Sequence, residues 1–210
     1  MGQYYNAVIV RGNTKTVYPT HVKPNDKTDL SQFNDWEREQ IKKTGSYYMC
    51  CKLLEHGYWG NPYTDGVAAE LQTPGRIAWV GDYVEQNELP DTFGEDDYEE
   101  FIVTEPENED FLKGKYLINH TKKEYISCDE FKEANQWQEK YTDMDGKNHE
   151  YIMCYHPLAL LTAAGNGRGG GDYYGKNKES IGVWKFDEIS VSDIEPTDFQ
   201  KKQFVFEPNM

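Results

Sequence analysis

Short runs of strand-forming residues, joined by tight-turn signals, limit the fold of this chain more than any other feature. Residues 3–11 are rich in β-favouring side chains, Gly12-Asn13 offers a turn, and residues 15–18 offer a return strand. A second hairpin is predicted around residues 120–122, and Asp145-Gly146 is a typical type I′ turn between two further runs. Because hairpins outnumber strand–helix–strand units, we expect an α+β fold with a mixed, mainly antiparallel sheet.

A few helices are expected to pack on this sheet. Asn61-Pro62 is a strong start signal, because Asn is a favoured N-cap and Pro is tolerated in the first helical turn. The helices that the sequence predicts are residues 31–43, 61–72, 129–140 and 157–164. Strands are predicted at residues 47–54, 76–80, 115–119, 124–127, 139–142, 150–154, 181–191 and 203–206.

The length of 210 residues fits one domain with a real core, in which aromatic side chains take a large share. Aromatic residues make up 14% of the chain, against only 37% for all hydrophobic residues. We expect a single domain over residues 1–210, with an acidic, loop-rich insertion at about residues 84–112. The start of the sequence lacks a signal-peptide pattern, no apolar run is long enough to span a bilayer, and the four cysteines show no paired spacing. A cytoplasmic protein with reduced thiols is therefore expected.

The net charge of −15 is concentrated in one segment. Thirteen of the 37 acidic residues lie between Ile77 and Leu112, where there is no Lys or Arg, and elsewhere acids and bases nearly balance. Such a surface repels nucleic acid and anionic membranes, attracts basic proteins, and could imitate a phosphate backbone. Alternatively, the segment is a solvated loop that only keeps the protein in solution. The candidate partner-binding residues are Glu95, Asp96, Asp97, Glu99 and Glu100.

A glycine-rich run at residues 165–175 is the strongest candidate for a ligand site. Its six glycines free the backbone to approach a ligand, and successive amides can form an anion-binding nest. The run is neither a phosphate-binding P-loop nor a dinucleotide fingerprint, since it follows a predicted helix and has no Gly-Lys-Ser/Thr. Alternatively, it is only a helix C-cap and a long turn. The candidate ligand-binding residues here are Gly165, Asn166, Gly167, Arg168, Gly169, Gly170 and Asp172.

Two histidine clusters add candidates for a pocket. His56 and Trp59 lie in an aromatic, glycine-flanked run, while His156 precedes the predicted helix at residues 157–164. If the chain is an enzyme, His156, Arg168 and Asp172 are the expected catalytic residues. No cysteine or histidine spacing suits a metal site, so neither a metal nor a cofactor is expected.

Three stretches carry a resemblance to a family: PGRIAWVGDY at residues 74–83, YLINHTKKEY at 116–125 and PLALLTAAGNGRGGGDY at 157–173. They resemble an uncharacterised family of small acidic proteins from phages and mobile elements of gut Firmicutes. The resemblance brings no functional residues with it. It implies a context in which small acidic accessory proteins often block a host defence.

These features lead to one main hypothesis and two alternatives. The main hypothesis is a non-enzymatic binding protein of a phage or mobile element that inhibits a host defence component. It would bind a basic, nuclease-like host protein through its acidic surface, or sequester a nucleotide-like small molecule. The first alternative is an enzyme that acts on a nucleotide or phosphorylated small molecule through the glycine-rich run. The second is a structural or immunity-type protein whose glycines serve packing alone.

Overall fold

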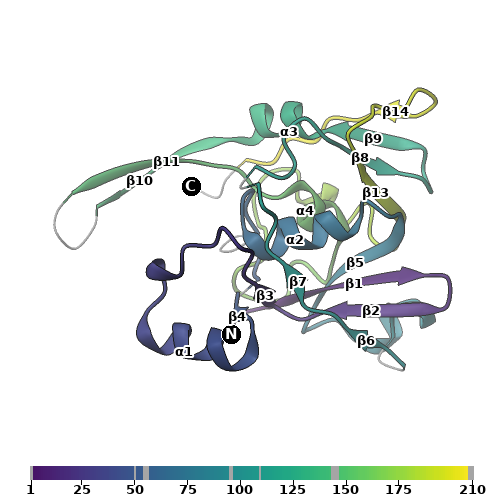
Figure 1. Ribbon diagram of the computed structural model, residues 1–210. Coiled ribbons are helices and arrows are strands. Elements are labelled where there is room, and N and C mark those ends of the chain that lie inside the picture. The colour runs from purple at the N-terminus through teal and green to yellow at the C-terminus, as the bar shows by residue number, and fades with distance from the viewer. Residues whose placement is uncertain are drawn as a thin grey trace.

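The computed structural model describes residues 2–49, 51–53, 57–94, 97–108, 110–142 and 147–207, and it has the expected α+β architecture (Figure 1). Its main sheet is built from strands that span the chain from residue 5 to residue 201. The strands of this sheet are β1 (Tyr5–Arg11), β2 (Thr14–Tyr18), β5 (Gly75–Gly81), β6 (Glu99–Glu100), β8 (Tyr116–Asn119), β9 (Glu124–Ser127), β12 (Ala163–Ala164), β13 (Glu188–Ser192) and β14 (Gln200–Lys201).

The strand order β14-β9-β8-β13-β5-β1-β2-β6 confirms a mixed, mainly antiparallel sheet. The predicted hairpins β1–β2 and β8–β9 are both present and antiparallel. The short strands β6, β12 and β14 add parallel pairings. Strand β13 lies between β8 and β5 and pairs antiparallel with both, so it joins the two hairpin-containing halves of the sheet.

Two helices and the first part of the acidic segment cover opposite faces of the central strands. Helices α2 (Pro62–Glu70) and α4 (Pro157–Thr162) share the main hydrophobic core with Tyr5, Ala7 and Ile9 of β1. The alternate residues Val8 and Val10 belong to a second cluster, which Phe93 and Leu89 of the acidic segment complete. Within the acidic segment, residues 84–112, Leu89 and Phe93 therefore pack against this face of the sheet, whereas Val103 and Leu112 belong to the main core.

Tyr63 of α2 fixes this helix to the sheet. Its hydroxyl donates to the carbonyl of Tyr18 at 2.6 Å and accepts the amide N–H of Ala7 at 3.1 Å. Its ring meets that of Trp79 edge to face, with centroids 5.7 Å apart. Burying two large aromatic rings with satisfied polar groups explains how a chain with few aliphatic residues holds a core.

The described residues also contain two smaller sheets and two further α-helices. Strand β3 (His21–Lys23) pairs with β4 (Tyr47–Tyr48) and β7 (Val103–Thr104), next to helix α1 (Asp35–Thr44). Helix α3 (Cys128–Asn135) leads into β10 (Trp137–Thr142), which pairs with β11 (Asn148–Met153) in a hairpin that extends away from the body (Figure 1). No helix in the described part of the chain is long and apolar enough to cross a membrane.

Several local predictions were wrong in their bounds. Helix α1 begins after Asn34, whose side chain caps it, and Ser31 lies in a preceding 3₁₀ turn. The helix predicted to reach residue 140 ends at Asn135, where the buried side-chain amide donates to the carbonyl of Phe204. Residues 181–187 form turns before β13, and the strand near the end is β14 rather than residues 203–206. The Asp145-Gly146 turn lies outside the described residues.

Candidate functional site

The nest predicted in the glycine-rich run holds a carboxylate of the chain itself. One oxygen of Asp172 accepts the amide N–H groups of Gly167, Arg168 and Gly169, at 2.8, 2.7 and 2.9 Å. Gly167 has a φ of +97°, a conformation that a side chain would strain, which explains the glycine at this turn. Asp172 is fully buried. None of these three amides is left for a ligand phosphate while Asp172 stays in place.

The amino-terminal strand region closes the other side of the loop. The hydroxyl of Tyr5 donates to the second oxygen of Asp172 at 2.6 Å, and burial raises the pKa of Tyr5, with the Asp172 contact adding to the rise. The amide of Gln3 donates to the carbonyl of Gly170, and its side chain donates to the carbonyl of Gly165. The loop is therefore a closed hydrogen-bonded unit.

Arg168 and Asn166 also have partners within the chain. The Arg168 guanidinium pairs with Glu88 at 2.6 Å and donates to the carbonyl of Tyr83. Asn166 exchanges two hydrogen bonds with the backbone of Tyr173. The salt bridge of Arg168 with Glu88 thus connects the glycine-rich loop to the acidic segment.

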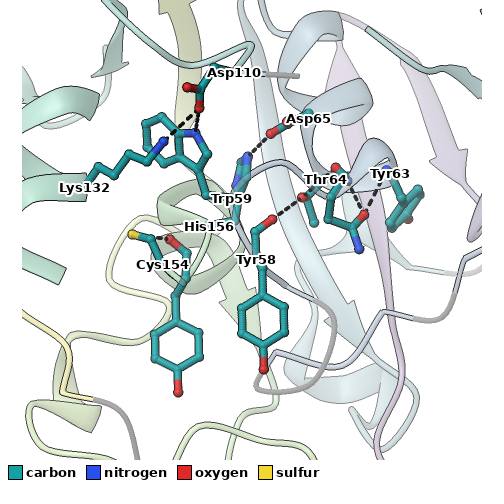
Figure 2. A network of polar contacts seen from close by, with 11 residues as sticks. Tyr58, Trp59, Tyr63, Thr64, Asp65, Asp110, Lys132, Cys154 and His156 are labelled. Carbon is teal, nitrogen blue, oxygen red and sulfur yellow. Dashed lines mark hydrogen bonds and ion pairs between the residues drawn. The ribbon is translucent and has the colours of Figure 1, made fainter. Parts of the chain in front are cut away.

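His156 lies in a separate buried contact. Its Nε2 is 3.1 Å from Oδ1 of Asp65, and both side chains are almost fully buried between α4 and α2 (Figure 2). Burial raises the pKa of Asp65, while its hydrogen bond with His156 lowers it. His156 therefore does not share a partner with Arg168 or Asp172, and the three expected catalytic residues do not form one hydrogen-bonded set.

Trp59 belongs to a polar network beside this pair. Its Nε1 donates to Asp110 at 2.7 Å, and Lys132 binds the same oxygen at 2.8 Å while lying over the Trp59 ring (Figure 2). The hydrogen bond from Lys132 is the main cause that lowers the pKa of Asp110. His56, which was predicted to accompany Trp59, lies outside the described residues.

Two of the five candidate partner-binding carboxylates lie at the edge of the main sheet. Glu99 and Glu100 form β6, which pairs with β2, and both are exposed, as is Asp97. None of the three has a salt bridge with a described residue. Glu95 and Asp96 lie outside the described residues.

Residues of the acidic segment also line a cleft that the sequence did not reveal. The cleft has a volume of about 740 Å³, and its lining comes from residues 25–37, from residues 105–107, and from Tyr47, Met49, Gly60 and Pro62. We call it the acidic cleft. The carboxylates that line it are Asp29, Glu37, Glu105 and Glu107, and Lys27 is the basic residue in the lining.

Glu105 holds the walls of the acidic cleft together. Its Oε2 accepts the hydroxyl of Thr28 at 2.5 Å and that of Tyr47 at 3.3 Å. The side-chain amide of Asn25 donates to the carbonyls of Glu105 and Pro106. Burial raises the pKa of Tyr47, and the charge of Glu105 adds to the rise. These contacts fix the backbone of both walls.

The electrostatics of the acidic cleft favour a cation. Glu107 forms an exposed salt bridge with Lys27 at 2.7 Å, and this contact lowers the pKa of Glu107. The three other carboxylates have no cationic partner in the lining. The cleft thus presents an excess of negative charge between ordered walls, which suits an ammonium or guanidinium group.

No family model, curated protein or solved structure matches this chain. In the described residues, there is also no group of three or more His, Cys, Asp or Glu side chains placed to hold a metal ion. What the chain binds must therefore be inferred from its own side chains, and the acidic cleft is a concave site lined by four carboxylates and one lysine.

Proposed function

We propose that this chain is a non-enzymatic binding protein that holds a cationic segment of a protein partner in the acidic cleft. The observation that carries the proposal is the lining of the cleft, where four carboxylates face one lysine. A lysine or arginine of a partner supplies the charge that these walls lack. Its attraction is stronger inside a cleft than on open surface, since less water screens it.

Ligands that carry phosphate suit this chain less well. The net charge of −15 repels nucleic acid and nucleotides. The loop amides that would bind a phosphate already bind Asp172. A nucleotide-sequestering protein, and an enzyme acting on a nucleotide through the glycine-rich loop, are alternatives that no contact of the described residues favours.

The partner that we propose is a basic, nuclease-like host protein. The resemblance to proteins of phages and mobile elements suggests this context, in which blocking a host defence is a common role. A nucleic-acid-binding channel is rich in Lys and Arg. An acidic protein seated there would compete with the nucleic acid itself.

A titration with a fluorescein-labelled peptide of alternating lysine and glycine, at fixed ionic strength, tests the proposal. Replacing Glu105 and Glu107 together by Gln should weaken binding about tenfold, because two charges that face the ligand are lost. Gln keeps the acceptor that Thr28 and Tyr47 use at Glu105, so the cleft walls should persist.

Two matched double variants make the same change of net charge elsewhere. Glu133→Gln with Glu179→Gln alters exposed carboxylates of α3 and of the 3₁₀ turn at Lys178–Ser180. Glu99→Gln with Glu100→Gln alters β6. Equal losses in all three double variants would contradict the proposal, since binding would then follow net charge alone. A largest loss at β6 would place the partner at the sheet edge instead.

A further inference from the structure

A second hollow lies beside the acidic cleft, along helix α1. It has a volume of about 330 Å³ and lies between α1 and β4. Phe33, Glu37, Tyr47 and Met49 line both hollows, so the two share a wall. We call the second hollow the aromatic groove.

Large side chains of the aromatic groove face solvent. Trp36 of α1 is 69% exposed and Tyr48 of β4 is 58% exposed. The ring of His21 meets that of Tyr48 edge to face, at 5.5 Å between centroids. An exposed tryptophan is costly in water, and Trp and Tyr are enriched among the residues that dominate binding energy at interfaces.

Trp36 takes no part in the caps or the buried contact of helix α1. Asn34 and Glu37 form a capping box at its start, Gly45 ends it in the left-handed conformation, and Ile41 is its buried residue. Capping and packing thus hold the helix through other side chains. Trp36 is left exposed in the lining of the aromatic groove.

We propose that the aromatic groove takes an apolar side chain of the same cationic segment, with Trp36 as its anchor. This inference rests on the proposed function and narrows the partner to a segment in which an apolar residue neighbours Lys or Arg. The shared wall places the two hollows within reach of one short peptide. Glu37 lies in both linings, so a positive charge beside the apolar residue also finds a carboxylate.

Two labelled peptides test the inference on the full chain. One alternates lysine and glycine, and the other has one central glycine replaced by leucine. Wild-type protein should bind the leucine peptide about tenfold more tightly, and Trp36→Ala should remove this gain while leaving the affinity for the glycine peptide unchanged. Trp36→Phe should keep most of the gain, because an aromatic ring remains. The tryptophan fluorescence of the wild type should shift to shorter wavelength with the leucine peptide only, and that of Trp36→Phe should not shift, although four tryptophans remain.

Ile152→Ala is the matched control, because Ile152 is also 69% exposed but lies on β11. It should bind both peptides like the wild type. The absence of a leucine gain, or a Trp36→Ala variant that keeps the gain, would overturn the inference. A variant that loses affinity equally for both peptides would also overturn it, since Trp36 would then act on the cleft as a whole. In each case the Glu105/Glu107 variant still reports separately on the proposed function.

Discussion

The carboxylates of the glycine-rich loop and of the acidic cleft both have partners within this chain, yet they differ in how far solvent reaches them. In the loop, one buried carboxylate takes three backbone amides and a tyrosine hydroxyl, all from this chain. In the cleft, carboxylates line a hollow with a single lysine among them. A loop with the sequence of an anion-binding site can thus bind its own carboxylate, and a binding site is better indicated by charge that stays accessible to solvent.

Removing the internal anion should have the largest effect on stability. Asp172→Ala leaves three amides and the Tyr5 hydroxyl without their acceptor in a buried site, so we expect a loss of about 3 kcal/mol or more in the free energy of unfolding. Urea denaturation followed by circular dichroism measures it. Asp172→Asn, which keeps one acceptor oxygen, should lose less. If the alanine variant is as stable as the wild type, the loop does not depend on Asp172 and again becomes a candidate ligand site.

The buried contact between Asp65 and His156 should give a smaller, pH-dependent effect. The folded pKa of Asp65 is raised by burial, so its contribution to stability is complete below about 3.8, the ordinary pKa, and is lost as pH rises through the folded pKa. Asn does not titrate. The difference between the unfolding free energy of the wild type and that of Asp65→Asn should therefore fall as the pH rises from about 3.8 through the folded pKa of Asp65. Urea titrations at several acidic pH values measure the difference, and a flat or rising curve would contradict the assignment.

Replacing Arg168 should have the smallest effect on stability, although the sequence makes this residue a candidate for ligand binding and catalysis. Its salt bridge with Glu88 is largely exposed, and exposed pairs contribute little. Arg168→Ala should leave the urea midpoint almost unchanged, and any difference should shrink when salt is added. A large loss that salt does not reduce would mean that Arg168 belongs to the closed unit around Asp172.

Local signals in the sequence predict much of this fold. The hairpins β1–β2 and β8–β9 and the start of α2 at Asn61 follow from turn, strand and cap chemistry that acts between neighbouring residues. Helix α3 is shorter than predicted because Asn135 binds the backbone at Phe204, nearly seventy residues away, and no local pattern encodes that contact.

The candidate site could be predicted only in part, for the same reason. The sequence shows that residues 84–112 are acidic, but not that Glu105 lies against Thr28 and Tyr47. It shows that the glycine loop can bind an anion, but not that Tyr5 and the loop together enclose Asp172. Both facts depend on pairings between distant segments, which composition and periodicity do not reveal.

The position of β13 has a consequence for how the chain is made. Strands β5 and β8 both pair with residues 188–192, which are synthesised well after both strands. Until then, the half with β1, β2 and β5 and the half with β8 and β9 each have an open strand edge, which invites pairing with other chains. A nascent chain of this protein should therefore depend on chaperones, and a product truncated before Glu188 should aggregate.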